Sequence, residues 1–151
     1  RRQRQMCIRD RTEPCNCGNC GCLEEYVSAT GIVRMAKRKL AKDDRPSIMR
    51  KDDLSAKDVW DAVKAGDTVA TEVAEDFGWY LGKAMALVAN VSNPEIFVIG
   101  GGVSKAGNVL LDYIQKYYQK YAFKGCRGAL FTLATLGNDA GIYGAARLVL
   151  E

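Results

Sequence analysis

Apolar positions recur at helical spacing over the first two thirds of the chain. Residues 23 to about 42 predict a first helix, in which Gly31 either divides the helix or admits a neighbouring backbone. Ser55 with Asp58 three positions later resembles a capping box, so we predict a short helix that starts there and stops at Gly66. That short helix is expected to bury Val59, Trp60 and Val63.

The longest predicted helix runs from an N-cap at Asp67 to about Ser92, where Asn93-Pro94 ends it because proline cannot continue a helix. Gly78 and Gly82 lie one turn apart inside it, and each costs roughly 1 kcal/mol in a helix interior. We therefore expect another element to approach closely at both glycines. The predicted buried stripe of this helix comprises Ala70, Val73, Phe77, Leu81, Ala84, Val88 and Val91.

Strand-type segments occupy the last third of the chain. Residues 95–99 predict a strand buried on both faces, and residues 129–136 predict a second strand. A helix is expected between them from about Lys105 to Tyr121, and a last helix after Asn138-Asp139. This order predicts an α/β fold with a parallel or mixed sheet. The apolar stripe of the intervening helix is predicted as Leu110, Tyr113, Ile114, Tyr117 and Tyr121.

Composition and charge narrow the class of protein. Hydrophobic residues make up 48% of 151 residues, which is typical of a globular domain. No apolar run reaches the roughly 18 residues that a membrane span needs. The net charge of +4 is carried by five arginines against Asp10 within the first eleven residues, and from Thr12 onward 17 basic residues balance 17 acidic ones. We therefore expect no nucleic-acid-binding face and no membrane contact.

The basic leader over residues 1–11 has neither an apolar period nor the hydrophobic stretch of a secretory signal. We interpret it as a non-native start, such as translated adapter sequence, with a disordered basic arm as the alternative. Residues 12–151 are predicted as one domain, with a helical part over 23–92 and a sheet-forming part over 93–151. Reduced cysteines and the lack of an export signal predict a cytoplasmic protein.

Residues 15–24 hold the densest candidate chemistry in the chain. Four cysteines fall within eight residues, at Cys15, Cys17, Cys20 and Cys22. Thiolates at such short spacing, on a backbone loosened by Gly18 and Gly21, can converge on one tetrahedral zinc ion. A disulfide knot is the alternative, but the chain offers no other cysteine pairs to build a disulfide framework. The sequence therefore favours a metal loop.

Three consecutive glycines separate the first predicted strand from the helix that follows. A nucleotide phosphate or ribose can approach the bare backbone N–H groups of Gly100, Gly101 and Gly102 at the positive end of the helix dipole. A structural turn explains the same glycines. The segment does not fit G-x-G-x-x-G, which argues against a dinucleotide-binding fold.

The motif C-x-C-G-x-x-G-C-L-E over residues 15–24, followed by Glu25-Tyr26 and residues 28–31, resembles the zinc-site signature of ROK-family sugar kinases, and among them the bacterial glucokinases. The resemblance extends from about Pro14 to the C-terminus. Residues 96–102 resemble the adenosine-binding turn of the actin-like ATPase and sugar-kinase superfamily, and residues 138–146 resemble its closing helix. The implied fold is the C-terminal lobe of this ribonuclease H-like architecture, with a zinc loop and a helical half.

The resemblance also implies roles for single residues. Glu24 matches the glutamate that hydrogen-bonds sugar hydroxyls, a task suited to a carboxylate. A charge favoured by the helix dipole is the alternative role for Glu24. Cys20 stands where the family usually has a residue that does not bind zinc. The residues matching the three zinc-ligating cysteines are Cys15, Cys17 and Cys22, and those matching the nucleotide-binding turn are Gly100, Gly101 and Gly102.

Three features of the family have no counterpart in this sequence. They are a histidine upstream of the cysteines as fourth zinc ligand, an Asp-x-Gly-Gly-Thr phosphate turn, and an aspartate base that takes the proton of the sugar hydroxyl. The resemblance therefore implies a fragment of an ATP-dependent glucokinase that is inactive alone and contains no catalytic residue. Structural zinc, Mg-ATP and a hexose are its implied ligands. Replacement of the histidine by Cys20 stays an open alternative.

Other functions remain open at this point. A sugar-responsive transcriptional repressor of the same family shares the domain behind a DNA-binding head. Kinases for N-acetylmannosamine, fructose or allose are rivals to a glucokinase. A free-standing zinc-binding interaction module without a sugar role is a third class. A homodimer is a further expectation, since relatives commonly form dimers.

Overall fold

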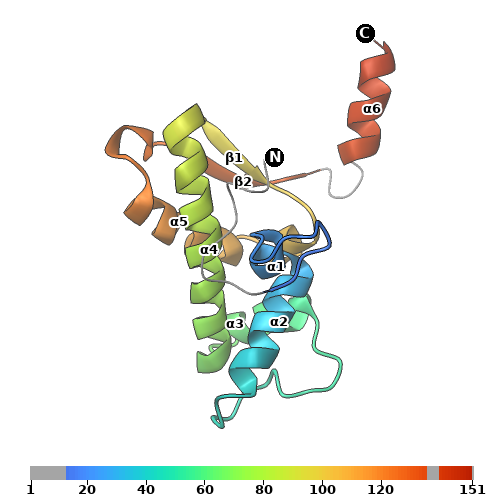
Figure 1. The fold of residues 1–151 in the computed structure, drawn as a ribbon, viewed down its shortest axis with the longest axis vertical. Helices are drawn as coiled ribbons and strands as arrows, with labels where there is room; N and C mark the ends of the chain where they lie inside the picture. Colours follow the sequence, from blue (N-terminus) through green and yellow to red (C-terminus); the bar gives the residue numbers. More distant parts are fainter. Residues whose placement is uncertain (1–12, 136–139, 151) are drawn as a thin grey trace.

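The computed structural model describes residues 13–135 and 140–150, which form a helical body, a small sheet and a last helix (Figure 1). The leader over residues 1–11 and the turn at Asn138-Asp139 lie outside the described residues. In chain order the elements are α1 (Glu24–Val27), α2 (Ala29–Leu40), α3 (Ala56–Lys64), α4 (Thr68–Ser92), β1 (Ile96–Ile99), the 3-10 helix η2 (Gly102–Ala106), α5 (Val109–Tyr121), the 3-10 helix η3 (Lys124–Cys126), β2 (Leu130–Leu133) and α6 (Ala140–Leu150).

The first predicted helix is in fact two helices, and the break falls at Ser28 rather than at Gly31. Ser28 has extended backbone geometry, and its Oγ accepts a 3.0 Å hydrogen bond from the Gly31 N–H, which caps α2. Gly31 does admit a neighbouring backbone, because an added Cβ would lie 2.8 Å from the carbonyl oxygen of Glu25. This close approach sets the angle between α1 and α2.

The caps predicted for α3 and α4 are confirmed. Ser55 and Asp58 form a reciprocal capping box at the start of α3, and Gly66 follows its end with a φ of +80°. Asp67 caps α4 by accepting a 3.0 Å hydrogen bond from the Ala70 N–H. These side chains act within a few residues of each other, which is why the sequence alone reveals them. The predicted core residues of α3 are buried: Val59, Trp60 and Val63.

The backbone of α5 lies directly on α4 at the two glycines. An added Cβ would lie 2.7 Å from the Tyr113 carbonyl oxygen at Gly78, and 2.6 Å from the Ile114 carbonyl oxygen at Gly82. The expected close approach is therefore a helix-to-helix contact.

The predicted stripe of α4 is wrong in its last turns, where Val88 is 43% exposed and Val91 is 91% exposed. Ala86 and Ala89 are buried there instead, because they face Tyr118 and Ala122 at the end of α5.

The sheet is parallel, as expected for strands joined by a helix, and pairs Ile96 with Leu130 through to Ile99 with Leu133. The prediction that β1 is buried on both faces is wrong. Phe97 and Phe131 stack on each other and pack edge-on against Tyr118 of α5, with centroids 5.6 and 5.0 Å from its ring. On the opposite face, exposed fractions are 47% for Ile96, 59% for Val98 and 66% for Leu130.

The helix between the strands begins later than predicted. Gly102–Ala106 form the short 3-10 helix η2, and Gly107 follows its end with a φ of +80°. The α-helix starts only at Val109. Tyr118, which the predicted stripe omits, is fully buried in α5 together with Leu110 and Ile114.

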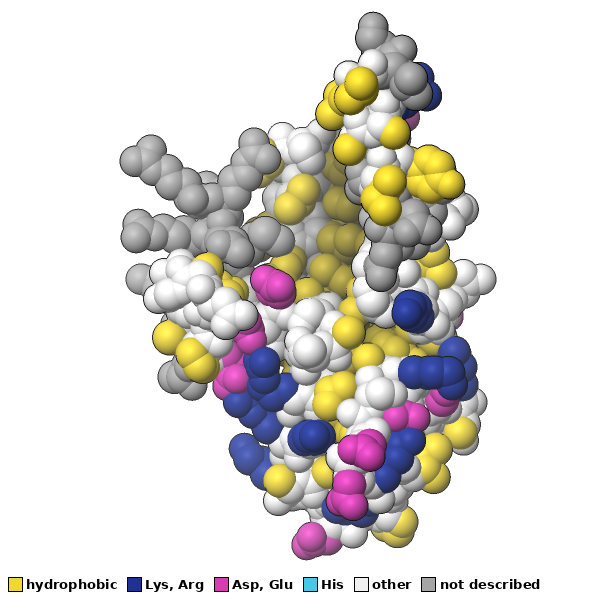
Figure 2. Space-filling model, turned by 90° about the vertical axis from the view of Figure 1, so that its right-hand side faces the viewer, with side chains coloured by type: hydrophobic (Ala, Val, Ile, Leu, Met, Phe, Trp, Pro, Cys, Tyr) yellow, Lys and Arg dark blue, Asp and Glu magenta, His cyan; other side chains and the backbone are white. Residues whose placement is uncertain are grey.

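The last helix lies apart from the helical body in Figure 1, and Figure 2 shows hydrophobic side chains in the hollow between them. Every side chain described from Ile142 to Val149 is exposed. Among the helices of the described residues, none combines the length and the apolar character needed to cross a bilayer.

Candidate metal and substrate site

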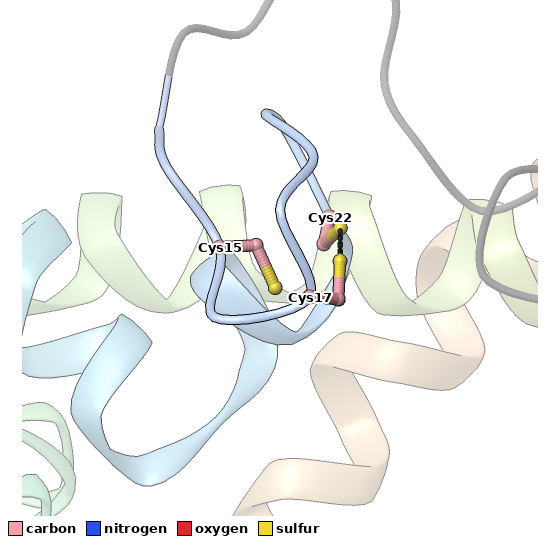
Figure 3. Close-up of side chains that lie close together, drawn as sticks. All are labelled: Cys15, Cys17 and Cys22. Carbon is pink, nitrogen blue, oxygen red and sulfur yellow. Dashed lines mark hydrogen bonds between the residues drawn. The ribbon is translucent and has the colours of Figure 1, made fainter.

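Three of the four clustered cysteines converge on one point in the structure (Figure 3). The Sγ atoms of Cys15, Cys17 and Cys22 lie within 4.8 Å of one another, and those of Cys17 and Cys22 are 3.4 Å apart. Sulfur ligands of a tetrahedral zinc ion, each at about 2.3 Å from the metal, are separated by about 3.8 Å. The donor set and its spacing therefore fit a zinc ion with three thiolate ligands and one further ligand position.

The loop that carries these thiols is shaped by its own backbone. Pro14 and Cys20 form an antiparallel bridge, and the Cys15 N–H donates to the Asn19 carbonyl at 2.8 Å. Gly18 and Gly21 have φ values of +84° and +72°, which residues with side chains rarely adopt. The two glycines fold the loop back on itself and so bring Cys22 to the first two cysteines.

Cys20 lies outside this cluster. It is exposed, and among the described residues the candidate metal-binding group consists of Cys15, Cys17 and Cys22. Cys22, by contrast, is buried, with 2% of its surface exposed. The arrangement therefore gives no support to Cys20 as a fourth ligand that replaces the missing histidine.

Hydrogen bonds within the loop shift the pKa values of Cys15 and Cys17 in opposite directions. A hydrogen bond from the Asn19 backbone, followed by those with the Cys22 and Cys15 thiols, lowers the pKa of Cys17 to about 7. The Cys17 backbone N–H lowers the pKa of Cys15, but the Cys17 thiol and burial outweigh it, so the pKa of Cys15 is raised. Cys17 is thus the first of the two to become a thiolate, which is the form that binds metal.

Glu24 begins α1 directly after the loop, and its side chain is exposed. The next residue, Glu25, is the one held in place: Arg34 Nη1 donates to its Oε2 at 2.6 Å and to its carbonyl oxygen at 3.2 Å. Arg34 also lies 3.5 Å from the Glu13 carboxylate, which forms a second ion pair with Arg38. This network joins the base of the cysteine loop, α1 and α2.

Sequence reasoning missed the network of Glu13, Glu25, Arg34 and Arg38. Its partners are 9 to 25 residues apart along the chain, so no local pattern relates them. Arg34 and Arg38 on α2 give no signal by themselves, because charged residues at exposed helix positions are ordinary. The fold alone brings them together.

The three glycines form an exposed turn at the carboxyl end of β1. Gly101 has a φ of +75°, and the Ser104 hydroxyl donates to its carbonyl at 2.8 Å. An added Cβ on Gly102 would lie 3.3 Å from the Ala29 Cβ at the start of α2. The glycine turn therefore lies beside the corner where α1 meets α2, one short helix away from Glu24.

The family model described as the ROK family matches residues 5–151. The chain belongs to the ROK family. The glucokinase of Halalkalibacterium halodurans is 47% identical over 143 residues, which cover 91% of this chain and 43% of that protein. The DNA-binding transcriptional dual regulator NagC of Escherichia coli is 34% identical over 137 residues, covering 91% of this chain and 34% of the regulator.

Solved structures of ROK proteins have the same fold. A ROK family glucokinase from Streptomyces griseus, crystallised with glucose and AMPPNP, matches with a TM-score of 0.81 and 30% sequence identity. The match covers 94% of this chain and 48% of that one. The chain thus spans less than half the length of each relative named here, and its architecture is that of ROK sugar kinases.

Proposed function

We propose that this chain is part of an ATP-dependent glucokinase, which transfers the γ-phosphoryl group of Mg-ATP to glucose and forms glucose 6-phosphate. The observation that carries the proposal is the close approach of Gly102 to Ala29, where a Cβ added to Gly102 would lie 3.3 Å from the Ala29 Cβ. It brings the candidate nucleotide turn next to the corner that presents the candidate sugar ligand Glu24. A nucleotide bound at the glycine turn and a sugar bound at Glu24 would therefore be neighbours within one short chain.

In this proposal Glu24 binds the sugar. It is exposed and begins a helix that Arg34 and Gly31 fix against α2. A carboxylate accepts charge-assisted hydrogen bonds from neighbouring hydroxyls, so it can orient a hexose. The three glycines give the nucleotide close access to backbone N–H groups.

Zinc would be structural and bound by Cys15, Cys17 and Cys22. When bound, the ion cross-links the loop by three thiolates and thereby limits the motion of the residues that follow, beginning with Glu24. Relatives named as glucokinases and the glucokinase solved with glucose and AMPPNP support the choice of substrates. Cytoplasmic location and a homodimer stay predictions.

A direct test fuses this chain to the portion of the Halalkalibacterium halodurans glucokinase that it does not match. We expect glucose-dependent turnover in the fusion, and a loss of kcat/KM of at least about 100-fold with Glu24→Gln. Glu95→Gln is the matched control, because Glu95 is an exposed carboxylate immediately before β1. Full activity of the Glu24→Gln fusion would exclude the role of Glu24.

This chain alone is expected to show no turnover in a coupled phosphorylation assay, because the phosphate turn and the aspartate base of the family have no counterpart in it. Turnover above background would contradict this expectation.

A sugar-responsive repressor is the second candidate, and the 34% identity to NagC favours it over unrelated classes. Kinases for other hexoses, such as N-acetylmannosamine or fructose, stay alternatives. Titrating this chain with glucose, N-acetylglucosamine and AMPPNP separates the candidates. Tighter binding of N-acetylglucosamine than of glucose, without binding of AMPPNP, would favour a repressor.

A further inference from the structure

Two thiols of the metal loop are close enough to form a disulfide. The Sγ atoms of Cys17 and Cys22 are 3.4 Å apart, and Figure 3 shows them pointing toward one another. A disulfide bond is about 2.0 Å long, so the two sulfur atoms need to approach by about 1.4 Å. Gly18 follows Cys17 and Gly21 precedes Cys22, and these glycines allow the backbone between the two thiols to adjust.

The two thiols differ in their access to solvent. Cys17 is exposed, whereas Cys22 has 2% of its surface exposed. A small oxidant therefore reaches the Cys17 sulfur first and finds the Cys22 sulfur beside it. Cysteine pairs that respond to oxidants are typically built in this way, with one accessible thiol and a second thiol next to it that closes the disulfide.

We propose that Cys17 and Cys22 form a reversible disulfide in the presence of a peroxide, and that this disulfide prevents the loop from holding a metal ion. The Cys17 sulfur attacks one oxygen of hydrogen peroxide, the O–O bond breaks, and Cys17 becomes a sulfenic acid as the first water molecule leaves. The Cys22 sulfur then attacks the Cys17 sulfur, so that the S–S bond forms, the S–O bond breaks and a second water molecule leaves. In total the two thiols give two electrons and two protons to one molecule of hydrogen peroxide.

The disulfide removes two of the three converging thiols from the candidate metal site. Cys15 is then the one cysteine of this group that can still offer a thiolate, which is the form that binds metal. The Cys22 carbonyl also accepts a hydrogen bond from the Glu25 N–H at 3.0 Å, so the change occurs at the start of α1. The loop would thus release zinc under oxidising conditions and bind it again after reduction. Formation of the disulfide does not depend on the proposed kinase function.

The test treats this chain, reduced and loaded with zinc, with hydrogen peroxide. Thiols that remain are blocked with iodoacetamide, the disulfide is reduced, and the released thiols are labelled with N-ethylmaleimide and located by tandem mass spectrometry. We expect the label on Cys17 and Cys22. Zinc, measured with a chromogenic chelator, should be released over the same time course, and dithiothreitol should restore its binding.

Single substitutions identify the partners of the disulfide. Cys17→Ser and Cys22→Ser should each lower the amount of label in the loop at least about tenfold, because each removes one of the two sulfur atoms. Cys20→Ser is the matched control, since Cys20 is an exposed thiol of the same loop that lies outside the cluster. It should form the disulfide as the unmodified chain does.

Four results would overturn the proposal. The first is a loop without label after peroxide treatment. The second is label on Cys20, or loss of the disulfide in the Cys20→Ser variant, because either would make Cys20 a partner. The third is zinc that stays bound to a chain in which Cys17 and Cys22 are linked. The fourth is oxidation that dithiothreitol does not reverse, which would indicate a sulfinic acid in place of a disulfide.

Discussion

Arg34 holds Glu25 through a side-chain contact of 2.6 Å and a contact of 3.2 Å to its backbone carbonyl, both from the same nitrogen. The two residues lie on successive short helices, so the pair fixes the orientation of α1 and of Glu24 at its start. The interaction raises the pKa of Arg34, chiefly through the hydrogen bond to Glu25.

We expect Arg34→Met to lower the free energy of unfolding by about 1–2 kcal/mol, because it leaves a Glu25 carboxylate with only 14% exposure unpaired. Arg38→Met is the control: Arg38 is 51% exposed, and its partner Glu13 keeps Arg34 at 3.5 Å, so the loss of Arg38 should cost about 0.5 kcal/mol or less. Urea unfolding of both variants measures the difference. Equal losses would show that the contact to Glu25 does not fix α1.

We expect the purified chain to contain one zinc ion, measured by elemental analysis. Cys15→Ser, Cys17→Ser and Cys22→Ser should each reduce the zinc content severely, because each removes one of three converging thiolates. Cys20→Ser should keep its zinc, since Cys20 lies outside the cluster. Loss of zinc from the Cys20 variant would make Cys20 a ligand after all.

Gly78→Ala and Gly82→Ala are expected to destabilise the protein by about 2–3 kcal/mol each, because the new methyl group meets backbone atoms of α5. This cost exceeds the gain of roughly 1 kcal/mol that alanine brings to a helix interior.

Gly144→Ala is the control for these two variants, since nothing lies within 4 Å of a Cβ added there. It should leave stability unchanged or raise it slightly in chemical denaturation. A neutral effect at Gly78 and Gly82 would contradict the close packing of α4 on α5.

Asp67 makes stability depend on pH. Burial raises its pKa, but hydrogen bonds from the Ala70 N–H, the Ser47 hydroxyl and the Ile48 N–H outweigh burial, so the pKa is lowered. A carboxylate with a lowered pKa stabilises the fold fully above its unfolded pKa of about 3.9, and the stabilisation disappears as pH falls through the folded value.

Asp67→Ala should therefore cost about 1–2 kcal/mol between pH 5 and 8. The difference from the unmodified chain should shrink as the pH falls below about 4. Thermal unfolding over a pH series measures it. A difference that grows toward low pH would show that the carboxylate is not the group responsible.

The features that the sequence predicted correctly depend on interactions between residues close together in the chain. The capping box of Ser55 and Asp58 and the N-cap of Asp67 act over three residues, so their sequence pattern suffices. The convergence of the cysteine thiols could also be predicted, because Cys15, Cys17 and Cys22 lie within seven positions of one another in the sequence. Gly78 and Gly82 predicted that another element packs closely against α4, but the sequence did not identify that element as α5.

The tertiary structure alone decided the rest. Val88 and Val91 fit the helical period of α4 but are exposed, because burial depends on where α5 ends and not on spacing. Arg34 pairs with Glu25, and Gly102 comes close to Ala29, although the partners belong to separate elements. Hydrogen bonds within a few residues are encoded locally, whereas the position of one element on another follows from the packing of the whole chain.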